Sequence, residues 1–119
     1  MLGQVNKMNV NEIVANALLT EFSSNQVYHD DIPEHGEYPM ICYKNIGENP
    51  VLHADNKLYA KEYIFRITVV TFGNSSIESL KTKIYNCMTE ADFMWITTGT
   101  ARDGKEYYTS LDFSYGVII

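Results

Sequence analysis

The longest strand signal in the chain is residues 59–72, and it constrains the fold more than any other feature. Side chains alternate across a strand, so the more apolar of its two faces is expected to face the core. At ~3.3 Å per residue the strand would span about 46 Å, beyond the usual length of about 3–10 residues. We therefore expect it to project beyond the domain at one end or to bend at a bulge. The expected core face comprises Tyr59, Lys61, Tyr63, Phe65, Ile67, Val69 and Thr71, and the opposite face Ala60, Glu62, Ile64, Arg66, Thr68, Val70 and Phe72.

Other segments have weaker strand character. A strand is expected at residues 38–46. It follows a polar loop at 29–37 and leads into an expected connection at 47–57. A final strand over residues 107–117 alternates cleanly and follows a hairpin turn at Asp103-Gly104. Its Leu111 and Phe113, with Phe65 and Ile67 of the long strand, are the expected core. Two shorter strands are expected, at residues 27–28 and in the apolar run 93–96.

Two helices are expected. The first has apolar residues at helical spacing from Val10 to Phe22, with Asn9 as the N-cap and Glu12 placed to complete a capping box. The second follows Ser75, which is expected to cap it as part of Ser-x-x-Glu with Glu78. Its apolar stripe comprises Ile77, Leu80, Ile84 and Cys87 or Met88.

The element order, a helix, strands, a helix and a hairpin, predicts an α+β fold. We expect a mostly antiparallel sheet with two helices packed on one face and one long strand or hairpin projecting. The 119 residues suit a single domain spanning 1–119.

Residues that could carry chemistry are scattered. His29-Asp30-Asp31 and His53-Ala54-Asp55 are loop clusters without the spacing of a metal site. There is no glycine-rich phosphate loop and no nucleophile elbow. Cys42 and Cys87 lie far apart in apolar runs, as buried free thiols do. We therefore expect no catalytic residue, metal or organic cofactor, and no enzymatic activity.

Charge excludes some partners. The formal net charge is −6, and Lys and Arg are scattered singly, whereas nucleic-acid binding needs clustered positive charge. No apolar run approaches the ~20 residues that a membrane span requires, and no signal peptide is recognisable. We expect no sequence-specific nucleic acid and no membrane as partner, and a protein that stays in the cytoplasm unless it is built into something larger.

The second face of the long strand is the candidate interface. It mixes apolar and charged side chains, and no further helix is expected to cover it. An ordinary solvated face with a few apolar residues is the alternative. The candidate subunit-interface residues are Glu62, Ile64, Arg66, Tyr108 and Asp112.

The layout of nearly the whole chain resembles the tail-completion (tail-terminator) proteins of long-tailed bacteriophages, as encoded in prophages of Gram-positive bacteria. After the first helix and an acidic loop, the resemblance rests on Tyr-Pro-Met-Ile-Cys-Tyr at 38–43 and His-Ala-Asp-Asn-Lys at 53–57. The long strand at 63–71, the capped helix and Tyr-Tyr-Thr-Ser-Leu-Asp-Phe-Ser-Tyr at 107–115 complete it. The family usually continues past the last strand, whereas this chain stops at Ile119.

The resemblance implies a structural role. Similar proteins form a ring, typically a hexamer, on the head-proximal end of the tail tube, where the ring ends tube polymerisation and presents a surface to the head connector. The implied partners are other copies of the chain, the tail tube protein and a head-connector or neck protein. The implied location is the host cytoplasm during assembly and the virion tail afterwards. Two alternatives stay open: another neck or minor tail component of the head-closure type, or a cytoplasmic small-ligand-binding domain or enzyme that uses the His29, Asp30, Asp31, His53 and Asp55 loops.

Overall fold

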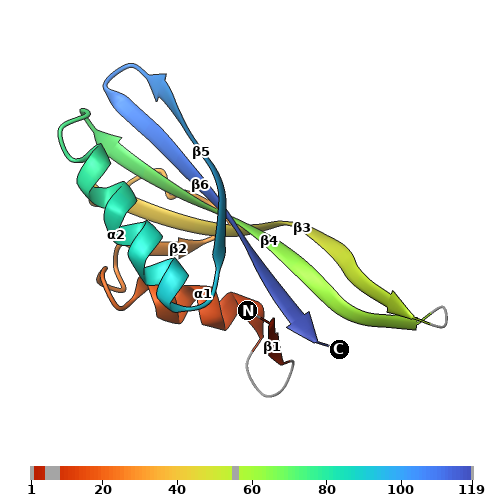
Figure 1. The fold of residues 1–119 in the computed structure, drawn as a ribbon. Coiled ribbons are helices and arrows are strands. Elements are labelled where there is room, and N and C mark those ends of the chain that lie inside the picture. The colour runs from red at the N-terminus through yellow and green to blue at the C-terminus, as the bar shows by residue number, and fades with distance from the viewer. Residues whose placement is uncertain (1, 5–8, 55–56, 119) are drawn as a thin grey trace.

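The structure, a computed structural model, describes residues 2–4, 9–54 and 57–118. Six strands form one sheet, and two helices pack on one of its faces (Figure 1). The strand order is β1-β6-β4-β3-β2, and β5 also pairs with β6. The elements in chain order are β1 (Leu2–Gln4), α1 (Val10–Leu18), β2 (Val27–His29), β3 (Met40–Ala54), β4 (Lys57–Phe72), α2 (Ile77–Glu90), β5 (Met94–Asp103) and β6 (Glu106–Ile118).

The long strand pairs are antiparallel, which confirms the predicted α+β class. β3 pairs with β4, β4 with β6, and β5 with β6 in antiparallel register, while the short strands β1 and β2 add parallel pairings to β6 and β3. The β3–β4 hairpin extends well past the helices, as the projecting arm in Figure 1 shows. The molecule is accordingly elongated, with extents of 53 × 25 × 24 Å.

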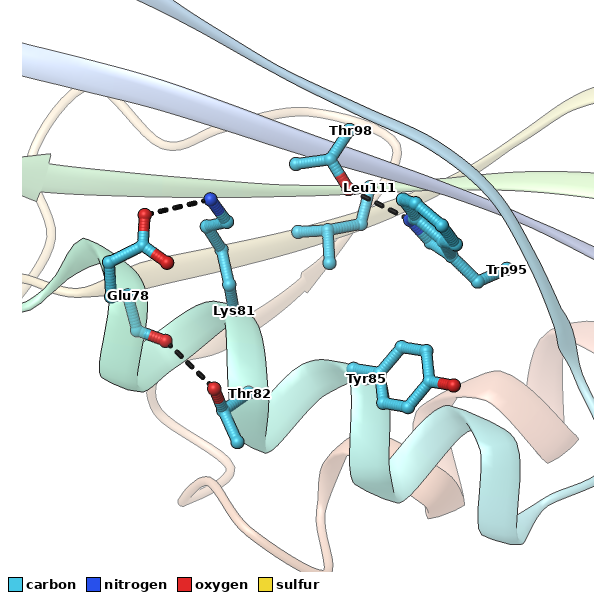
Figure 2. Close-up of a pocket in the computed structure, with 7 residues that line it drawn as sticks. All are labelled: Glu78, Lys81, Thr82, Tyr85, Trp95, Thr98 and Leu111. Carbon is cyan, nitrogen blue, oxygen red and sulfur yellow. Dashed lines mark hydrogen bonds and ion pairs between the residues drawn. The ribbon is translucent and has the colours of Figure 1, made fainter.

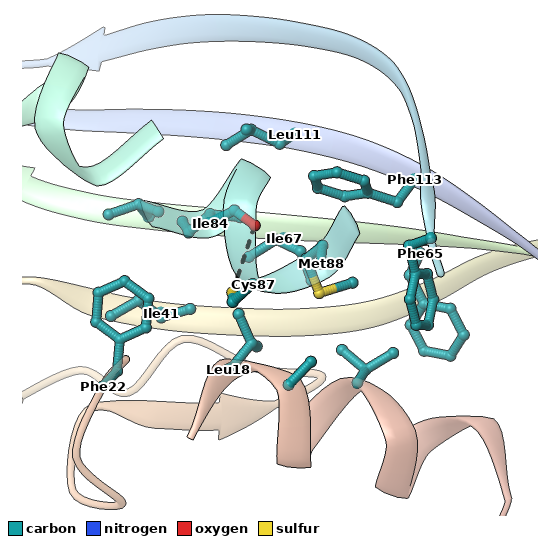
Figure 3. Close-up of a cluster of buried hydrophobic side chains, with 14 of the residues drawn as sticks. Leu18, Phe22, Ile41, Phe65, Ile67, Ile84, Cys87, Met88, Leu111 and Phe113 are labelled. Carbon is teal, nitrogen blue, oxygen red and sulfur yellow. Dashed lines mark hydrogen bonds between the residues drawn. The ribbon is translucent and has the colours of Figure 1, made fainter. Parts of the chain in front are cut away.

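The core lies between the helices and one face of the sheet (Figure 3). Phe65, Ile67, Leu111 and Phe113 are all fully or almost fully buried, so the predicted strand phase is confirmed. The helices contribute apolar side chains at helical spacing. They are Val14, Ala17 and Leu18 from α1, and Ile77, Leu80, Ile84, Cys87 and Met88 from α2.

The N-terminus of α1 is capped as predicted. The Asn9 side chain accepts a hydrogen bond from the Glu12 backbone N–H at 2.9 Å, and its amide nitrogen donates to Glu12 Oε1 at 3.3 Å. This reciprocal pair satisfies a backbone donor that the helix itself leaves without a partner.

The predicted cap of α2 is wrong. The helix begins at Ile77, and its N-cap is Ser76 rather than Ser75. Ser76 has a helical ψ of 0° and makes no side-chain capping hydrogen bond, because the extended backbone that aims a capping oxygen at the helix is absent. The Glu78 carboxylate instead accepts a hydrogen bond from Lys81 Nζ at 2.9 Å.

The expected connection at residues 47–57 is strand almost throughout. β3 continues to Ala54 and pairs with β4 from Lys57 onward. Register shifts at Asn45/Gly47, Pro50/Leu52 and Leu52/His53 accommodate residues that otherwise favour loops. The run 93–96 is also more than a short strand, because Phe93 is buried before β5 begins and β5 continues to Asp103.

Candidate functional site

The five predicted interface residues lie together on the face of β4 and β6 that points away from the helices. The register places Arg66 opposite Asp112, with Ile64 opposite Ser114 and Tyr108 opposite Val70. Arg66 is exposed, Glu62, Ile64 and Tyr108 are half-buried, and Asp112 is buried. The structure therefore brings the predicted residues onto one surface, which we call the outer face.

Arg66 and Asp112 pair within the chain. Arg66 Nε lies 2.9 Å from Asp112 Oδ1, and Nη2 lies 3.1 Å from Oδ2, so the guanidinium engages both carboxylate oxygens. The hydrogen bonds to Asp112 raise the pKa of Arg66. Because the side chain of Asp112 is only 12% exposed, this pair tethers β4 to β6. Glu62, Ile64 and Tyr108 are partly exposed and Arg66 stays 48% exposed, so these four candidates remain accessible to another molecule.

One end of the outer face is covered by the polar loop at residues 29–37, which joins β2 to β3 and which we call the acidic loop. An added Cβ at Gly36 would lie 2.7 Å from Met40 Sδ and 3.2 Å from Tyr28 Oη, so the loop backbone lies close against side chains of β3 and β2. Met40 and Val70, which pair across β3 and β4, are buried although no helix lies on this face. The sequence predicted a polar loop here, and most of its residues are exposed, but the sequence did not indicate that the loop covers part of the sheet.

Tyr38 extends the covered region toward β6. Its hydroxyl donates to Glu106 Oε2, and the Tyr108 hydroxyl donates to Glu106 Oε1 at 3.3 Å. The hydrogen bond to Glu106 is the main cause that raises the pKa of Tyr38, whereas burial is the main cause for Tyr108. The Tyr38 ring lies 5.7 Å from the ring of Phe72, which is 62% exposed. An aromatic cluster thus sits at the rim of the outer face.

A second exposed surface lies along β5, which we call the β5 edge. In the described part of the chain β5 pairs only with β6, and its first three side chains, Met94, Trp95 and Ile96, are 66%, 48% and 47% exposed. A register shift at Trp95/Thr97 accompanies this run. The sequence predicted a short apolar strand over residues 93–96 and did not indicate this exposure. Three consecutive apolar residues were the available signal, because alternation forces at least one of them away from the core.

A groove of about 240 Å³ lies between α2 and β5 (Figure 2). Trp95 Nε1 donates to Thr98 Oγ1 at 2.8 Å, and the Trp95 ring meets the Tyr85 ring edge-on at 6.5 Å. The buried side chain of Leu111 also lines the groove. The remaining lining residues are Glu78, Lys81 and Thr82.

The histidines and cysteines assemble no recognisable reactive site among the residues that the structure describes. His29 Nε2 lies 3.2 Å from Asp30 Oδ1, and the His29 ring stacks on Tyr43 at 4.8 Å. The described residues contain no group of three or more His, Cys, Asp or Glu side chains placed to hold a metal ion. The side chain of His53 and residue 55 lie outside the described residues. Cys42 and Cys87 are buried, and burial raises the pKa of each thiol to about 11.

No family model matches the chain, and no curated protein matches it either. Among the described residues, neither helix has the length and apolar character needed to cross a bilayer.

Proposed function

We propose that this chain is a structural subunit of a bacteriophage tail. In this proposal, six copies of the chain form a ring on the head-proximal end of the tail tube. The ring ends tube polymerisation and joins the tail to a head-connector or neck protein. The subunit acts in the host cytoplasm during assembly and remains in the virion tail.

The observation that carries the proposal is the one-sided construction of the sheet. Both helices cover one face, while the outer face keeps Glu62, Ile64 and Arg66 partly or fully accessible. The projecting β3–β4 hairpin lengthens this surface beyond the body of the domain (Figure 1). A subunit with two unlike exposed surfaces, the outer face and the β5 edge, is suited to head-to-tail contacts, which close into a ring when the rotation fits.

A neck or minor tail component of the head-closure type remains the nearest alternative, because it requires the same exposed surfaces. The small-ligand alternative has less support. Its proposed cluster is represented in the described residues only by His29, Asp30 and Asp31, and the His29 ring is stacked on Tyr43.

Native mass spectrometry and negative-stain electron microscopy test the proposal. The phage that encodes this chain is first altered so that it makes no functional copy. Tail tubes purified from that mutant are then mixed with the protein. We expect rings at one end of each tube and tubes of uniform length. Tubes that keep growing, with no added density at either end, would refute the proposal. Density at an already completed neck, with tube length unchanged, would support the head-closure alternative instead.

A further inference from the structure

The β5 edge exposes three apolar residues in a row, Met94, Trp95 and Ile96. In the described part of the chain, β5 pairs with β6 on one side and with no strand on the other. We propose that free subunits form a symmetric dimer in which β5 pairs antiparallel with β5 of a second copy. The inference goes beyond the proposed function, because it concerns the free subunit, whose β5 edge must be released before it contacts a neighbour in a ring.

The two long edges of the sheet differ in how they are protected. From Met94 to Ala101, β5 has no charged residue and no proline, and its only register shift is near its start. Beyond Tyr43, the edge of β3 has three register shifts and Pro50, which are features that discourage pairing with another strand. The β5 edge therefore lacks the usual protection against a strand from another molecule.

The charge pattern of β5 permits pairing with its own copy. A strand that pairs with its own copy meets its own sequence in reverse order, so a charge on it can come to face a like charge. The stretch from Met94 to Ala101 avoids this because it is uncharged. The residues that flank it carry both signs, with Asp92 before it and Arg102 and Asp103 after it. The choice of partner and register therefore rests on the sizes of the side chains.

The order of side-chain sizes along β5 fits its own reversal. Ile96 is the extra residue of a bulge, because β6 pairs with Trp95 and Thr97 at successive positions and skips it. With Ile96 skipped in the same way, a pairing centred on Thr98 opposes residues that lie on the same face of the sheet. It sets large side chains against small ones, keeps every pair within the uncharged stretch and uses its full length. The opposed pairs are Met94 with Ala101, Trp95 with Thr100, Thr97 with Gly99, and Thr98 with itself.

Gly99 independently indicates that another chain approaches β5. Its φ is not positive, and apart from its two chain neighbours no atom of the described chain lies within 4 Å of where its Cβ would be. Nothing within the described chain therefore requires glycine here, although glycine weakens a strand interior. Such a glycine often marks a place where another backbone comes close. The register centred on Thr98 places Thr97 of the second copy opposite this gap.

The groove beside β5 adds side-chain contact to the strand pairing. Trp95 and Tyr85 are half-exposed on its walls, and Leu111 lies buried at its base (Figure 2). Antiparallel pairing about a two-fold axis perpendicular to the sheet keeps the helices of both copies on one face, so the two grooves lie on the same side of the paired strands. Exposed aromatic residues beside a pocket are typical of the centre of an interface. Since the contact uses the same edge of both copies, association stops at two.

Charge mixing provides the first test, read by sedimentation velocity of the full chain. Thr97 is exposed, and in the proposed register the two copies of residue 97 are diagonal neighbours. Thr97→Lys and Thr97→Glu should therefore each weaken the dimer about tenfold by like-charge repulsion. An equimolar mixture of the two variants should recover dimers, because the facing charges then have opposite signs. Lys83→Glu, an exposed reversal on α2, is the matched control and should leave the dimer unchanged.

Recovery on mixing is specific to a symmetric contact. In a head-to-tail contact residue 97 does not meet its own counterpart, so the mixture would stay as weak as either variant. That result would overturn the inference. Circular dichroism of each variant checks that it remains folded.

Tryptophan fluorescence provides the second test. Trp95 is the single tryptophan of the chain, and pairing with Thr100 of the second copy removes water from its ring. Its emission should shift to shorter wavelength as wild-type protein is concentrated, and the shift should need a higher concentration in Thr97→Lys. Dimerisation without a change in emission would place the contact elsewhere and overturn the inference.

Cysteine cross-linking provides the third test. Thr98→Cys should form disulfide-linked dimers by itself on oxidation, because residue 98 lies opposite its own counterpart at a distance that a disulfide spans. Lys83→Cys on α2 is the control and should not cross-link. The native thiols stay unreactive because both are buried. Wild-type protein that stays monomeric at millimolar concentration would overturn the inference, as would dimers in which Thr98→Cys does not cross-link.

The two proposals can fail separately. If rings form on tail tubes but the free protein is monomeric at millimolar concentration, the inference falls and the proposed function stands. If the β5 dimer is found but the protein adds nothing to tail tubes, the reverse holds.

Discussion

The two faces of the sheet are held by different kinds of interaction. The helix-covered face is closed by apolar side chains such as Phe65, Ile67 and Phe113, which are buried against both helices. The outer face is closed in part by the acidic loop and in part by the Arg66–Asp112 pair, and the remainder stays accessible. Most of the stabilising apolar burial therefore lies on the helix-covered face, whereas the outer face depends on a charged pair and a loop.

The largest expected effect breaks the helix-covered face. Phe65→Ala and Phe113→Ala should each lower the free energy of unfolding by about 3–5 kcal/mol, because each leaves a cavity in a packed core. Urea unfolding followed by circular dichroism measures the change at one fixed protein concentration. Ile64→Ala, the neighbour of Phe65 on the outer face, is the matched control and should cost much less. Equal losses at the two positions would contradict the comparison.

The next effect concerns the charged pair on the outer face. Arg66→Ala should destabilise the protein by about 1–3 kcal/mol, because it leaves the buried Asp112 carboxylate without its partner. Asp112→Ala should cost less, because the Arg66 side chain left behind is 48% exposed and stays hydrated. A double-mutant cycle measured by urea unfolding gives the coupling between the two residues. The asymmetry would be disproved if Asp112→Ala were the more damaging change.

The two cysteines report on the two faces separately. Cys42 pairs with Thr68 and lies on the outer face beneath the acidic loop, whereas Cys87 belongs to α2 and the core. Because the thiolate is the reactive form and burial raises the pKa of both thiols to about 11, both should react slowly at pH 8. Cys42 should still react faster, because a loop opens more readily than the whole domain unfolds.

Mass spectrometry after timed alkylation in low concentrations of urea separates the two sites. Modification of Cys42 before any loss of helical circular dichroism is the expected result. Simultaneous modification of both residues would mean that the outer face opens only with global unfolding.

The smallest expected effect on stability tests the accessible part of the outer face. Ile64→Asp should change the free energy of unfolding by about 1 kcal/mol or less, since Ile64 is only half-buried. The same variant should weaken the oligomer that the proposed function requires, because a charge then faces the neighbouring molecule. Sedimentation velocity and circular dichroism on the same samples distinguish the two effects. Ser79→Asp on α2 adds the same charge to the helix layer and should leave the oligomer intact.

The helix-covered face could be predicted from the sequence because periodicity alone defines it. The alternation that placed Phe65, Leu111 and Phe113 in the core and the Asn9 cap of α1 both depend on neighbouring residues only. The outer face could not be predicted in the same way. Its covering by the loop around Gly36 and its pairing of Arg66 with Asp112 depend on residues far apart in the chain.

The same limit explains the errors at the two edges. Gly47 and Pro50 are typical loop residues, and only their pairing with β4 reveals that β3 passes through them with shifts in register. The exposure of Trp95 and Ile96 follows from the absence, within the described residues, of a strand beyond β5, which no local pattern indicates. The candidate interface residues were placed on one surface correctly, but their role in assembly stays a prediction.

The position of β6 has a consequence for synthesis of the protein. β6 follows every other described element in the chain, yet it pairs with β1, β4 and β5. β3 can pair with β4 before β6 is made, but β1 and β5 have no partner strand until β6 leaves the ribosome, so the sheet is completed late. Ribosomes that stall before residue 106 should therefore yield protease-sensitive chains that depend on chaperones.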